Sequence, residues 1–306
     1  MRLIIAYIFT SVIFLNTSSE VSNGKKFSTC LNQEPLFTFG IIADVQYADS
    51  DPAGTRFYRS SPARLREAIS EFRKDSVDFV ITLGDLIDKD IRSYDPLLDI
   101  IDSSGLRFYH VTGNHDYSVG EKYRKRLPSV YSRGRGYYSI LHKGCRLIFL
   151  NGNDISTYGS DNKASVKQAN ALLDTLKKRG EINAMEWNGG IGEKQLIWFD
   201  KQLNEAKVKN DKVLIFCHFP VLPENVHNLL NYKDIINTMA KYQNIAVWFN
   251  GHNHEGNYDY YNKTHFVTMK GMVESETQNS FARVDVYSDK ILIFGSGRET
   301  DRALTY

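Results

Sequence analysis

The chain has 306 residues, a hydrophobic fraction of 42% and a formal net charge of +2. That length allows one large domain or two small ones, and the hydrophobic fraction is ample for a buried core. A charge this close to neutral argues against a dedicated nucleic-acid binder, which would normally carry a strong basic excess.

The first segment of the chain is typical of a secretory signal peptide. Arg2 supplies a positive start, residues 3–15 are uncharged and largely apolar, and residues 17–19 are small enough for cleavage. The apolar run is shorter than the roughly 20 residues that span a bilayer, although an uncleaved N-terminal anchor is the alternative. We therefore expect a signal peptide over 1–19 and a linker over 20–35. The mature protein is then exported, periplasmic or secreted, without a membrane attachment.

The remaining residues alternate between runs that favour strands and runs that favour helices. Helices are expected over 63–74, 96–103, 161–180, 192–207 and 226–242, and strands outside the five described below over 137–141, 146–150, 265–269, 281–287 and 290–294. Such alternation, followed by a meander of strands at the end, predicts an α/β protein with two packed mixed sheets and helices outside. We expect one catalytic domain over 36–306.

Five of the apolar runs end at side chains that bind metals. The runs are residues 36–43, 77–83, 106–112, 213–216 and 245–249, and the side chains that follow them are Asp44 with Gln46, Asp85, Asn114 with His115, His218, and His252 with His254. In an open α/β sheet, ligands bind at the carboxyl ends of the strands. A lone Asp or His there is more often a cap or a structural residue. Five such positions in order instead predict two divalent cations, which a single carboxylate can bridge.

The motifs also follow the order found in a known superfamily. They read Asp44-Val45-Gln46, Gly84 to Asp88, Gly113 to Asp116, His218-Phe219-Pro220 and Gly251 to His254. In this the chain resembles the calcineurin-like metallophosphoesterases. Gln46, the loop over 54–59 and the Trp-Asn-Gly-Gly stretch at 187–190 make it similar to the manganese-dependent ADP-ribose/CDP-alcohol diphosphatases. The resemblance covers residues 37–306 and implies a four-layer αββα sandwich.

The resemblance assigns a role to each motif residue. Asp44 and His254 would hold the first ion, Asp85 would bridge to the second, and Asn114, His218 and His252 would complete the second site. Gln46 stands where most of the superfamily has His, so the first site would bind its ion less tightly and favour Mn, with Fe and Zn as the other options. Two cations make hydroxide available near neutral pH for attack on phosphorus. His115 would be the general acid or a hydrogen-bond donor to the leaving oxygen, and Asp116 would orient His115 or a loop.

The loop after the first strand carries the candidate substrate residues. Arg56 and Arg59 are suited to a second phosphate, because guanidinium groups bind phosphate oxygens in pairs; the alternative is that both are solvated loop charges. Tyr58 is expected to bind substrate with them, and the aromatic candidates for stacking on a base are Tyr47, Phe57, Tyr58 and Trp187. Together with these residues, the resemblance implies an enzyme that cleaves the diphosphate of small nucleotide-linked substrates, namely ADP-ribose or CDP-alcohols. We expect it to be a monomer. A phosphomonoesterase or cyclic-nucleotide phosphodiesterase is the alternative enzyme, and a non-catalytic binding protein would be expected to lack some of the ligands.

Overall fold

The computed structural model describes residues 33–119, 123, 136–159 and 163–306. The chain divides into two compact units, Met1–Glu34 and Pro35–Tyr306, and the second unit contains every helix and strand given below. The expected signal peptide over 1–19 lies outside the described residues. Residues 20–32 of the expected linker over 20–35 also lie outside them. Among the residues that are described, no helix is both long and apolar enough to cross a bilayer.

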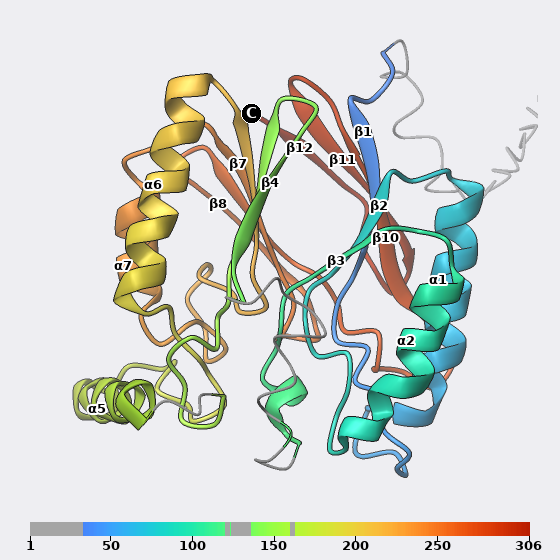
Figure 1. Cartoon of the computed structure of the whole chain (residues 1–306), viewed down its shortest axis with the longest axis horizontal. Helices are drawn as coiled ribbons and strands as arrows, with labels where there is room; N and C mark the ends of the chain where they lie inside the picture. Colours follow the sequence, from blue (N-terminus) through green and yellow to red (C-terminus); the bar gives the residue numbers. More distant parts are fainter. Residues whose placement is uncertain (1–32, 120–122, 124–135, 160–162) are drawn as a thin grey trace, which may run out of the picture. The chain divides into compact units, whose positions relative to one another are not determined.

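The second unit contains two six-stranded sheets (Figure 1). The first has the order β12-β11-β10-β1-β2-β3. Its strands are β1 (Phe37–Ile42), β2 (Phe79–Thr82), β3 (Phe108–His110), β10 (Ser280–Val286), β11 (Lys290–Gly297) and β12 (Arg302–Thr305). Strands β1, β2 and β3 are parallel, whereas β10, β11 and β12 continue the sheet through antiparallel pairs. The sheet is therefore mixed, as expected.

The second sheet has the order β4-β5-β6-β7-β9-β8. Its strands are β4 (Tyr138–His142), β5 (Cys145–Phe149), β6 (Lys212–Phe216), β7 (Ile245–Asn250), β8 (Asn257–Tyr261) and β9 (Thr264–Thr268). The four inner strands are parallel, and β4 and β8 close the two edges through antiparallel hairpins. The inner strands are almost entirely buried because both faces of the sheet are covered, which explains their continuous apolar sequences.

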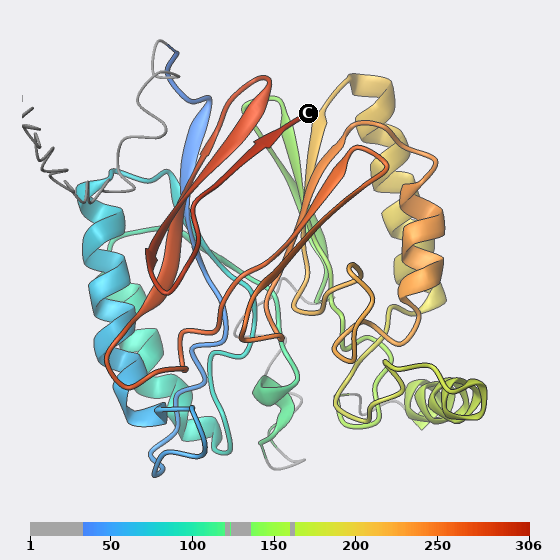
Figure 2. The same cartoon turned by 180° about the vertical axis from the view of Figure 1, so that it is seen from behind.

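Helices cover the outer face of each sheet (Figures 1 and 2). Helices α1 (Ser61–Lys74) and α2 (Tyr94–Ser103) share a hydrophobic cluster with the first sheet, and α6 (Glu193–Lys209) and α7 (Tyr232–Met239) share one with the second. A third cluster joins the two sheets face to face. The order helix, sheet, sheet, helix confirms the predicted four-layer αββα sandwich. Helix α5 (Lys163–Arg179) packs through Leu173 and Leu176 on Leu230.

Helix α1 shows how the sequence positions a layer. Its buried residues Leu65, Ala68, Ile69 and Phe72 recur at helical spacing, and a proline stands in its first turn. The Phe72 ring lies on Gly40 of β1, where a Cβ atom would come within 2.6 Å of the ring. Glycine at this position therefore allows the helix to approach the strand that leads to Asp44.

Three expectations about the elements differ from the structure. The helix expected over 226–242 begins only at Tyr232, because the preceding residues are held in a loop: the Asn228 side chain donates to the Val221 carbonyl, and the Leu230 amide donates to the Gly189 carbonyl. Strands β8 and β12 were not expected. The C-terminal strands also do not form one meander, because β9 joins the second sheet and β10 to β12 join the first.

Candidate metal centre

The predicted ligands come from loops that follow β1, β2, β3, β6 and β7, at the carboxyl ends of the parallel strands. The backbone adopts left-handed conformations at Asp44 (φ 53°), Gln46 (φ 44°), Asp85 (φ 52°) and His252 (φ 67°). Non-glycine residues adopt such conformations rarely, and clusters of them are typical of functional sites. The His252 amide lies 3.2 Å from both carboxylate oxygens of Asp44, which ties the loop after β7 to the loop after β1.

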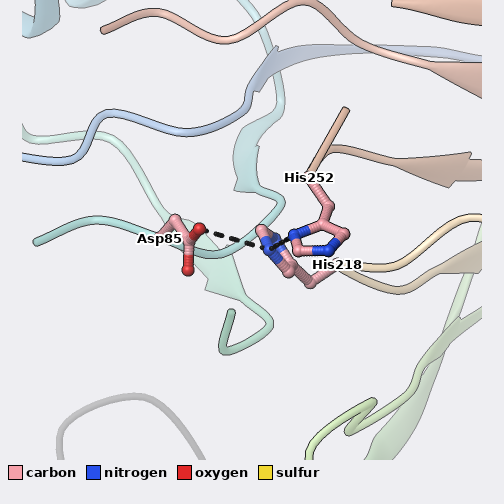
Figure 3. Close-up of side chains that lie close together, drawn as sticks. All are labelled: Asp85, His218 and His252. Atoms are coloured by element: carbon pink, nitrogen blue, oxygen red, sulfur yellow. Dashed lines mark hydrogen bonds and ion pairs between the residues drawn. The ribbon is translucent and has the colours of Figure 1, made fainter. Parts of the chain in front are cut away.

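Four ligand atoms surround one point between the sheets. The Nε2 atom of His218 lies 3.3 Å from Asp85 Oδ2 and 3.2 Å from His252 Nδ1 (Figure 3). It also lies 3.1 Å from Asn114 Oδ1. Ligands at about 2.1 Å from a common cation lie roughly 3.0–3.4 Å from one another. Asp85, His218 and His252 are all buried and form a group able to hold a metal ion. The residues predicted for the second ion therefore have the spacing that a cation needs.

Hydrogen bonds outside this cluster fix the tautomers of its two histidines. His218 Nδ1 donates to the Leu83 carbonyl at 2.7 Å, which leaves the lone pair of Nε2 directed at the cluster. His252 Nε2 donates to Asn188 Oδ1 at 3.0 Å, because the Asn188 Nδ2 group donates to the carbonyls of Asn183 and Val226. Nitrogen lone pairs and oxygen atoms thus face one another at hydrogen-bond distance. With neutral imidazoles this arrangement is repulsive, so the cluster needs either a proton or a cation among these atoms.

The residues predicted for the first ion form an adjoining cluster. His254 Nε2 lies 3.4 Å from Asp44 Oδ1 and 3.3 Å from Gln46 Nε2, and Gln46 Nε2 lies 3.2 Å from Asp85 Oδ2. Asp85 Oδ2 therefore belongs to both clusters, while Asp85 Oδ1 accepts the His115 amide at 2.7 Å. His254 Nδ1 donates to Glu274 Oε1 at 2.6 Å, so its Nε2 lone pair is directed at the cluster. One carboxylate oxygen is thus placed to bridge two cations.

Gln46 also fits a cation at the first position. Its buried Oε1 atom has no hydrogen-bond donor among the described residues, and a buried carbonyl oxygen without a partner is costly. The oxygen and nitrogen atoms of an amide exchange places on a half-turn. That rotation brings Oε1 between Asp85 and His254, where a cation would be its partner.

The buried carboxylates of the centre favour positive charge on the groups around them. Burial disfavours charged imidazolium. Asp85 nevertheless raises the pKa of His218 to about 9, and Asp44 raises the pKa of His254 to about 9. Burial and the neighbouring His218 instead lower the pKa of His252. Although burial disfavours its charged form, the nearby His218 and His115 hold the pKa of Asp85 well below its usual range. Divalent cations would supply the positive charge in place of protons.

His115 faces the same pocket from the short helix η4 (His115–Tyr117). Its Nδ1 atom lies 3.1 Å from Asp88 Oδ1, and Ser118 Oγ donates to the same oxygen at 3.0 Å. Burial opposes protonation of His115, but Asp85 and Asp88 raise its pKa above the usual value. The residue that orients His115 is therefore Asp88.

Asp116 has the other role that was considered for it, which is to hold a loop. Its carboxylate accepts the amides of Asp85 and Gly113 at 3.0 and 2.9 Å, the amide of Leu86 at 3.0 Å and the Tyr94 hydroxyl at 2.9 Å. These bonds fix the loop that carries Asp85. A Cβ atom at Gly113 would lie only 2.1 Å from Asp85 Oδ1, so glycine is required there.

A pocket of about 430 Å³ opens over the two clusters. It is lined by Gln46, Arg56, Asp85, Asn114, His115, Trp187, His227, His252 and His254. Arg56 is therefore at the site as predicted, with its Nε atom 3.8 Å from Glu274 Oε1.

The structure does not place Tyr58 and Arg59 in this pocket. The Tyr58 ring is buried against Ala48 and Val273, and Lys89 Nζ lies 4.3 Å from its centroid. Arg59 is exposed and pairs with Asp49 at 2.7 Å and Asp51 at 2.6 Å. Both residues belong to the short helix η2 (Tyr58–Ser60), in which Tyr58 is buried and Arg59 is exposed. Arg59 therefore matches the alternative of a solvated loop charge.

Sequence reasoning missed three residues of the site. Asn188 has no role of its own in the sequence analysis beyond the Trp-Asn-Gly-Gly stretch, His227 falls in an expected helix, and Glu274 is not singled out. Asn188 and Glu274 orient His252 and His254, and His227 lines the pocket with its ring centroid 5.3 Å from that of His252. The only signal for Asn188 was its place in the Trp-Asn-Gly-Gly stretch, and Glu274 had none.

Comparison with known proteins agrees with this geometry. The family model for calcineurin-like phosphoesterases matches residues 37–256. A protein from Xenopus tropicalis named manganese-dependent ADP-ribose/CDP-alcohol diphosphatase is 30% identical, over 90% of this chain and 95% of its own length. The human protein of that name is 28% identical, over 90% of this chain and 94% of its own length.

A solved structure shares the fold. The crystal structure of a dimetal phosphatase from Danio rerio superposes with a TM-score of 0.81 at 27% sequence identity, covering 89% of this chain and 100% of that one. The two clusters described above occupy the strand ends of the same kind of sandwich. The chain belongs to the calcineurin-like phosphoesterase family.

Proposed function

We propose that this chain is a manganese-dependent hydrolase that cleaves the diphosphate of nucleotide-linked substrates such as ADP-ribose and CDP-alcohols. The observation that supports it best is the pair of clusters sharing Asp85 Oδ2, with Arg56 lining the same pocket. The relatives named as diphosphatases span nearly the whole chain and support the substrate class.

The chemistry divides between the cations and the side chains around them. Two divalent cations lower the pKa of a bound water and neutralise charge on phosphoryl oxygens. In the first cluster Asp44, Gln46 and His254 would hold one ion; in the second Asn114, His218 and His252 would hold the other, with Asp85 shared. Mn fits a donor set of oxygens and imidazoles.

His115 and Arg56 act on the substrate rather than on the ions. His115, held by Asp88, donates a proton or a hydrogen bond to the oxygen that leaves phosphorus. Arg56 binds the second phosphate of the substrate through its guanidinium group, and its contact with Glu274 keeps that group beside the centre. A phosphomonoester has no second phosphate, so Arg56 favours a diphosphate as substrate.

We also propose that the protein is exported through residues 1–19 and acts as a monomer. The first part rests on the charged start and apolar run of the sequence. The second rests on the composition of the site, because every residue proposed to act there comes from one chain.

A substrate panel with added Mn tests the proposed function. The panel is ADP-ribose, CDP-choline, bis-p-nitrophenyl phosphate and p-nitrophenyl phosphate, each measured with the wild type and with Arg56→Ala. The proposal predicts that the two nucleotide diphosphates are the best substrates. It also predicts that Arg56→Ala lowers their kcat/KM roughly ten- to a hundredfold, since a charge-assisted contact is lost, and affects p-nitrophenyl phosphate much less.

Two results of the panel would contradict the proposal. A preference for p-nitrophenyl phosphate or bis-p-nitrophenyl phosphate would favour a phosphomonoesterase or a phosphodiesterase. Equal loss by Arg56→Ala on all four compounds would mean that Arg56 supports the shared centre instead of binding a second phosphate.

A further inference from the structure

Trp187 is an exposed aromatic ring on an anchored backbone. Its side chain keeps 45% of its surface exposed although it lines the pocket over the metal centre. The Trp187 carbonyl accepts the Tyr158 hydroxyl at 3.0 Å. The next residue, Asn188, is fully buried and held by the carbonyls of Asn183 and Val226. A large apolar ring that is open to solvent on an anchored backbone is suited to bind a flat ligand.

The two ends of the pocket are connected to different clusters. Trp187 precedes Asn188, which orients His252 in the second cluster at 3.0 Å. Arg56 contacts Glu274, which orients His254 in the first cluster at 2.6 Å. A ligand that crosses the centre therefore has an aromatic contact near the second cluster and a cationic contact near the first.

We propose that Trp187 stacks on the nucleobase of the substrate, so that the phosphorus attacked is the one that carries the nucleoside. This deepens the proposed function and rests on it for the identity of the substrate. With the base on Trp187, the nucleoside phosphate lies over the centre and the second phosphate reaches Arg56. His115 lines the same pocket, and in this orientation it serves the leaving phosphate.

The surroundings of the ring favour a neutral base over a cationic group. A quaternary ammonium such as choline would also stack on tryptophan. However, the pocket lining already contains the cationic side chain of Arg56. The carboxylate in that lining belongs to Asp85, which the ions share. A planar, uncharged heterocycle is therefore the better partner for Trp187.

This orientation determines which bond forms and which bond breaks. For ADP-ribose, an oxygen from water bonds to the phosphorus attached to adenosine, and the bond from that phosphorus to the bridging oxygen breaks. The bridging oxygen leaves on ribose 5-phosphate and takes a proton from His115. The attacking water loses one proton to solvent and brings the other into the phosphate of AMP, and His115 regains a proton from solvent. The water oxygen ends in AMP, whereas attack on the other phosphorus would place it in ribose 5-phosphate.

Binding of the two products tests the stacking without relying on turnover. Calorimetry would measure AMP and ribose 5-phosphate binding to the Mn-loaded wild type, Trp187→Leu, Trp187→Phe and Ile197→Ala. Ile197 is a matched control because it is an apolar side chain, 64% exposed, on the outer helix α6. We expect Trp187→Leu to weaken AMP binding roughly five- to a hundredfold with ribose 5-phosphate unchanged. Trp187→Phe should retain most of the affinity, Ile197→Ala should match the wild type, and all four proteins should bind equal amounts of Mn.

Hydrolysis of ADP-ribose in ¹⁸O-labelled water tests the orientation. Mass spectrometry of the products should find the label in AMP and not in ribose 5-phosphate. Label in ribose 5-phosphate would overturn the orientation.

Three further results would overturn the stacking. The first is a wild type that binds AMP no tighter than ribose 5-phosphate, and the second is a Trp187→Leu variant with unchanged AMP affinity. The third is a kcat/KM loss by Trp187→Leu that is confined to CDP-choline and spares CDP-glycerol, since this would assign the ring to the cationic alcohol.

The outcomes separate this inference from the proposed function. If ADP-ribose is hydrolysed but AMP affinity does not depend on Trp187, the stacking is wrong and the diphosphatase stands. If AMP binds through Trp187 but ADP-ribose is not cleaved, the base site stands and the proposed reaction is wrong.

Discussion

The three histidines of the metal centre differ in the ring nitrogen that they present. His218 and His254 direct Nε2 at the ligand clusters, whereas His252 directs Nδ1. The partner of the other nitrogen decides this in each case, and the partners are the Leu83 carbonyl, Glu274 and Asn188. Such partners make an imidazole a better ligand and hold its orientation. They lie as far as 135 positions from the histidine in sequence, so the motifs alone did not reveal them.

Glu274 should matter for metal affinity although it is not itself a ligand. Glu274→Ala removes the acceptor for His254 Nδ1, and we expect the affinity for the first Mn ion to fall roughly 10–100-fold. Calorimetric titration of the metal-free protein with Mn would measure this. Glu276→Ala, two residues away and exposed, is the matched control and should leave both affinities unchanged. Equal Mn affinities in the two variants would contradict the role of Glu274.

His115 should act on the leaving group. His115→Ala is expected to lower kcat about 10²–10⁴-fold with the metal content unchanged, and the loss should shrink for substrates whose leaving groups need little protonation. Asp88→Asn should show a smaller loss with the same dependence, because Asp88 acts through His115. Steady-state kinetics on aryl phosphate esters of graded leaving-group pKa would measure it. A loss of the same size for all leaving groups would exclude proton donation by His115.

At the scale of elements, the sequence predicted the buried strands better than the edge strands. Strands β5, β6, β7 and β9 lie inside the sheet, and their near-continuous burial leaves a clear apolar pattern. Strand β8 is an edge strand with Tyr258, Tyr260 and Tyr261 exposed, so it has no such pattern. The expected helix over 226–242 was too long because hydrogen bonds to distant carbonyls compete with helix formation at Asn228.

The positions of the candidate metal ligands were predictable for the same reason that the inner strands were. Each motif follows a buried strand, so its place at one edge of the sheets follows from the topology. The substrate contacts were less predictable, because Tyr58 and Arg59 lie in a loop where neighbouring side chains point in different directions. Their positions depend on packing against Val273 and on ion pairs with Asp49 and Asp51, which the sequence pattern does not encode.

Strand β3 gives the fold a predicted sensitivity to acid. Burial lowers the pKa of His110 to about 4, and Thr82 Oγ1 lies 2.6 Å from its Nδ1 atom. The unfolded chain therefore binds a proton at His110 below pH 6.5 while the folded chain remains neutral down to about pH 4. The free energy of unfolding should fall between these pH values as pH decreases, by of order 1–3 kcal/mol from this group.

Urea denaturation of the metal-free protein at a series of pH values would measure the contribution of His110. His110→Gln cannot be protonated in this range, so its unfolding free energy should decrease less between pH 6.5 and pH 4 than that of the wild type. Parallel curves for the two proteins would show that His110 does not carry this dependence.

For the whole molecule, the site combines both halves of the chain. Asp44, Asp85 and Asn114 follow strands of the first sheet, and His218 and His252 follow strands of the second. The hydrophobic cluster that joins the two sheets therefore also sets the distance between the ligands. Loss of either sheet would separate the ligands. Formation of the site therefore depends on the whole sandwich.

The proposed export predicts where the mature protein begins. If residues 1–19 are a signal peptide, native protein should start near Glu20 and be found outside the cytoplasm. N-terminal sequencing of protein purified from its natural source, after cell fractionation, would measure both. Material that begins at Met1 would contradict cleavage and favour an N-terminal anchor or a cytoplasmic protein.

The central claim is that Asp85 bridges two cations, and counting metal ions in Asp85→Asn tests it most directly. Elemental analysis after equilibration with Mn and dialysis should find two ions in the wild type and in Asp99→Asn, a control in which the changed carboxylate is exposed on α2. Asp85→Asn should bind fewer ions and lose turnover while its circular dichroism stays that of the folded protein. An Asp85→Asn protein with two bound ions and normal turnover would contradict the account.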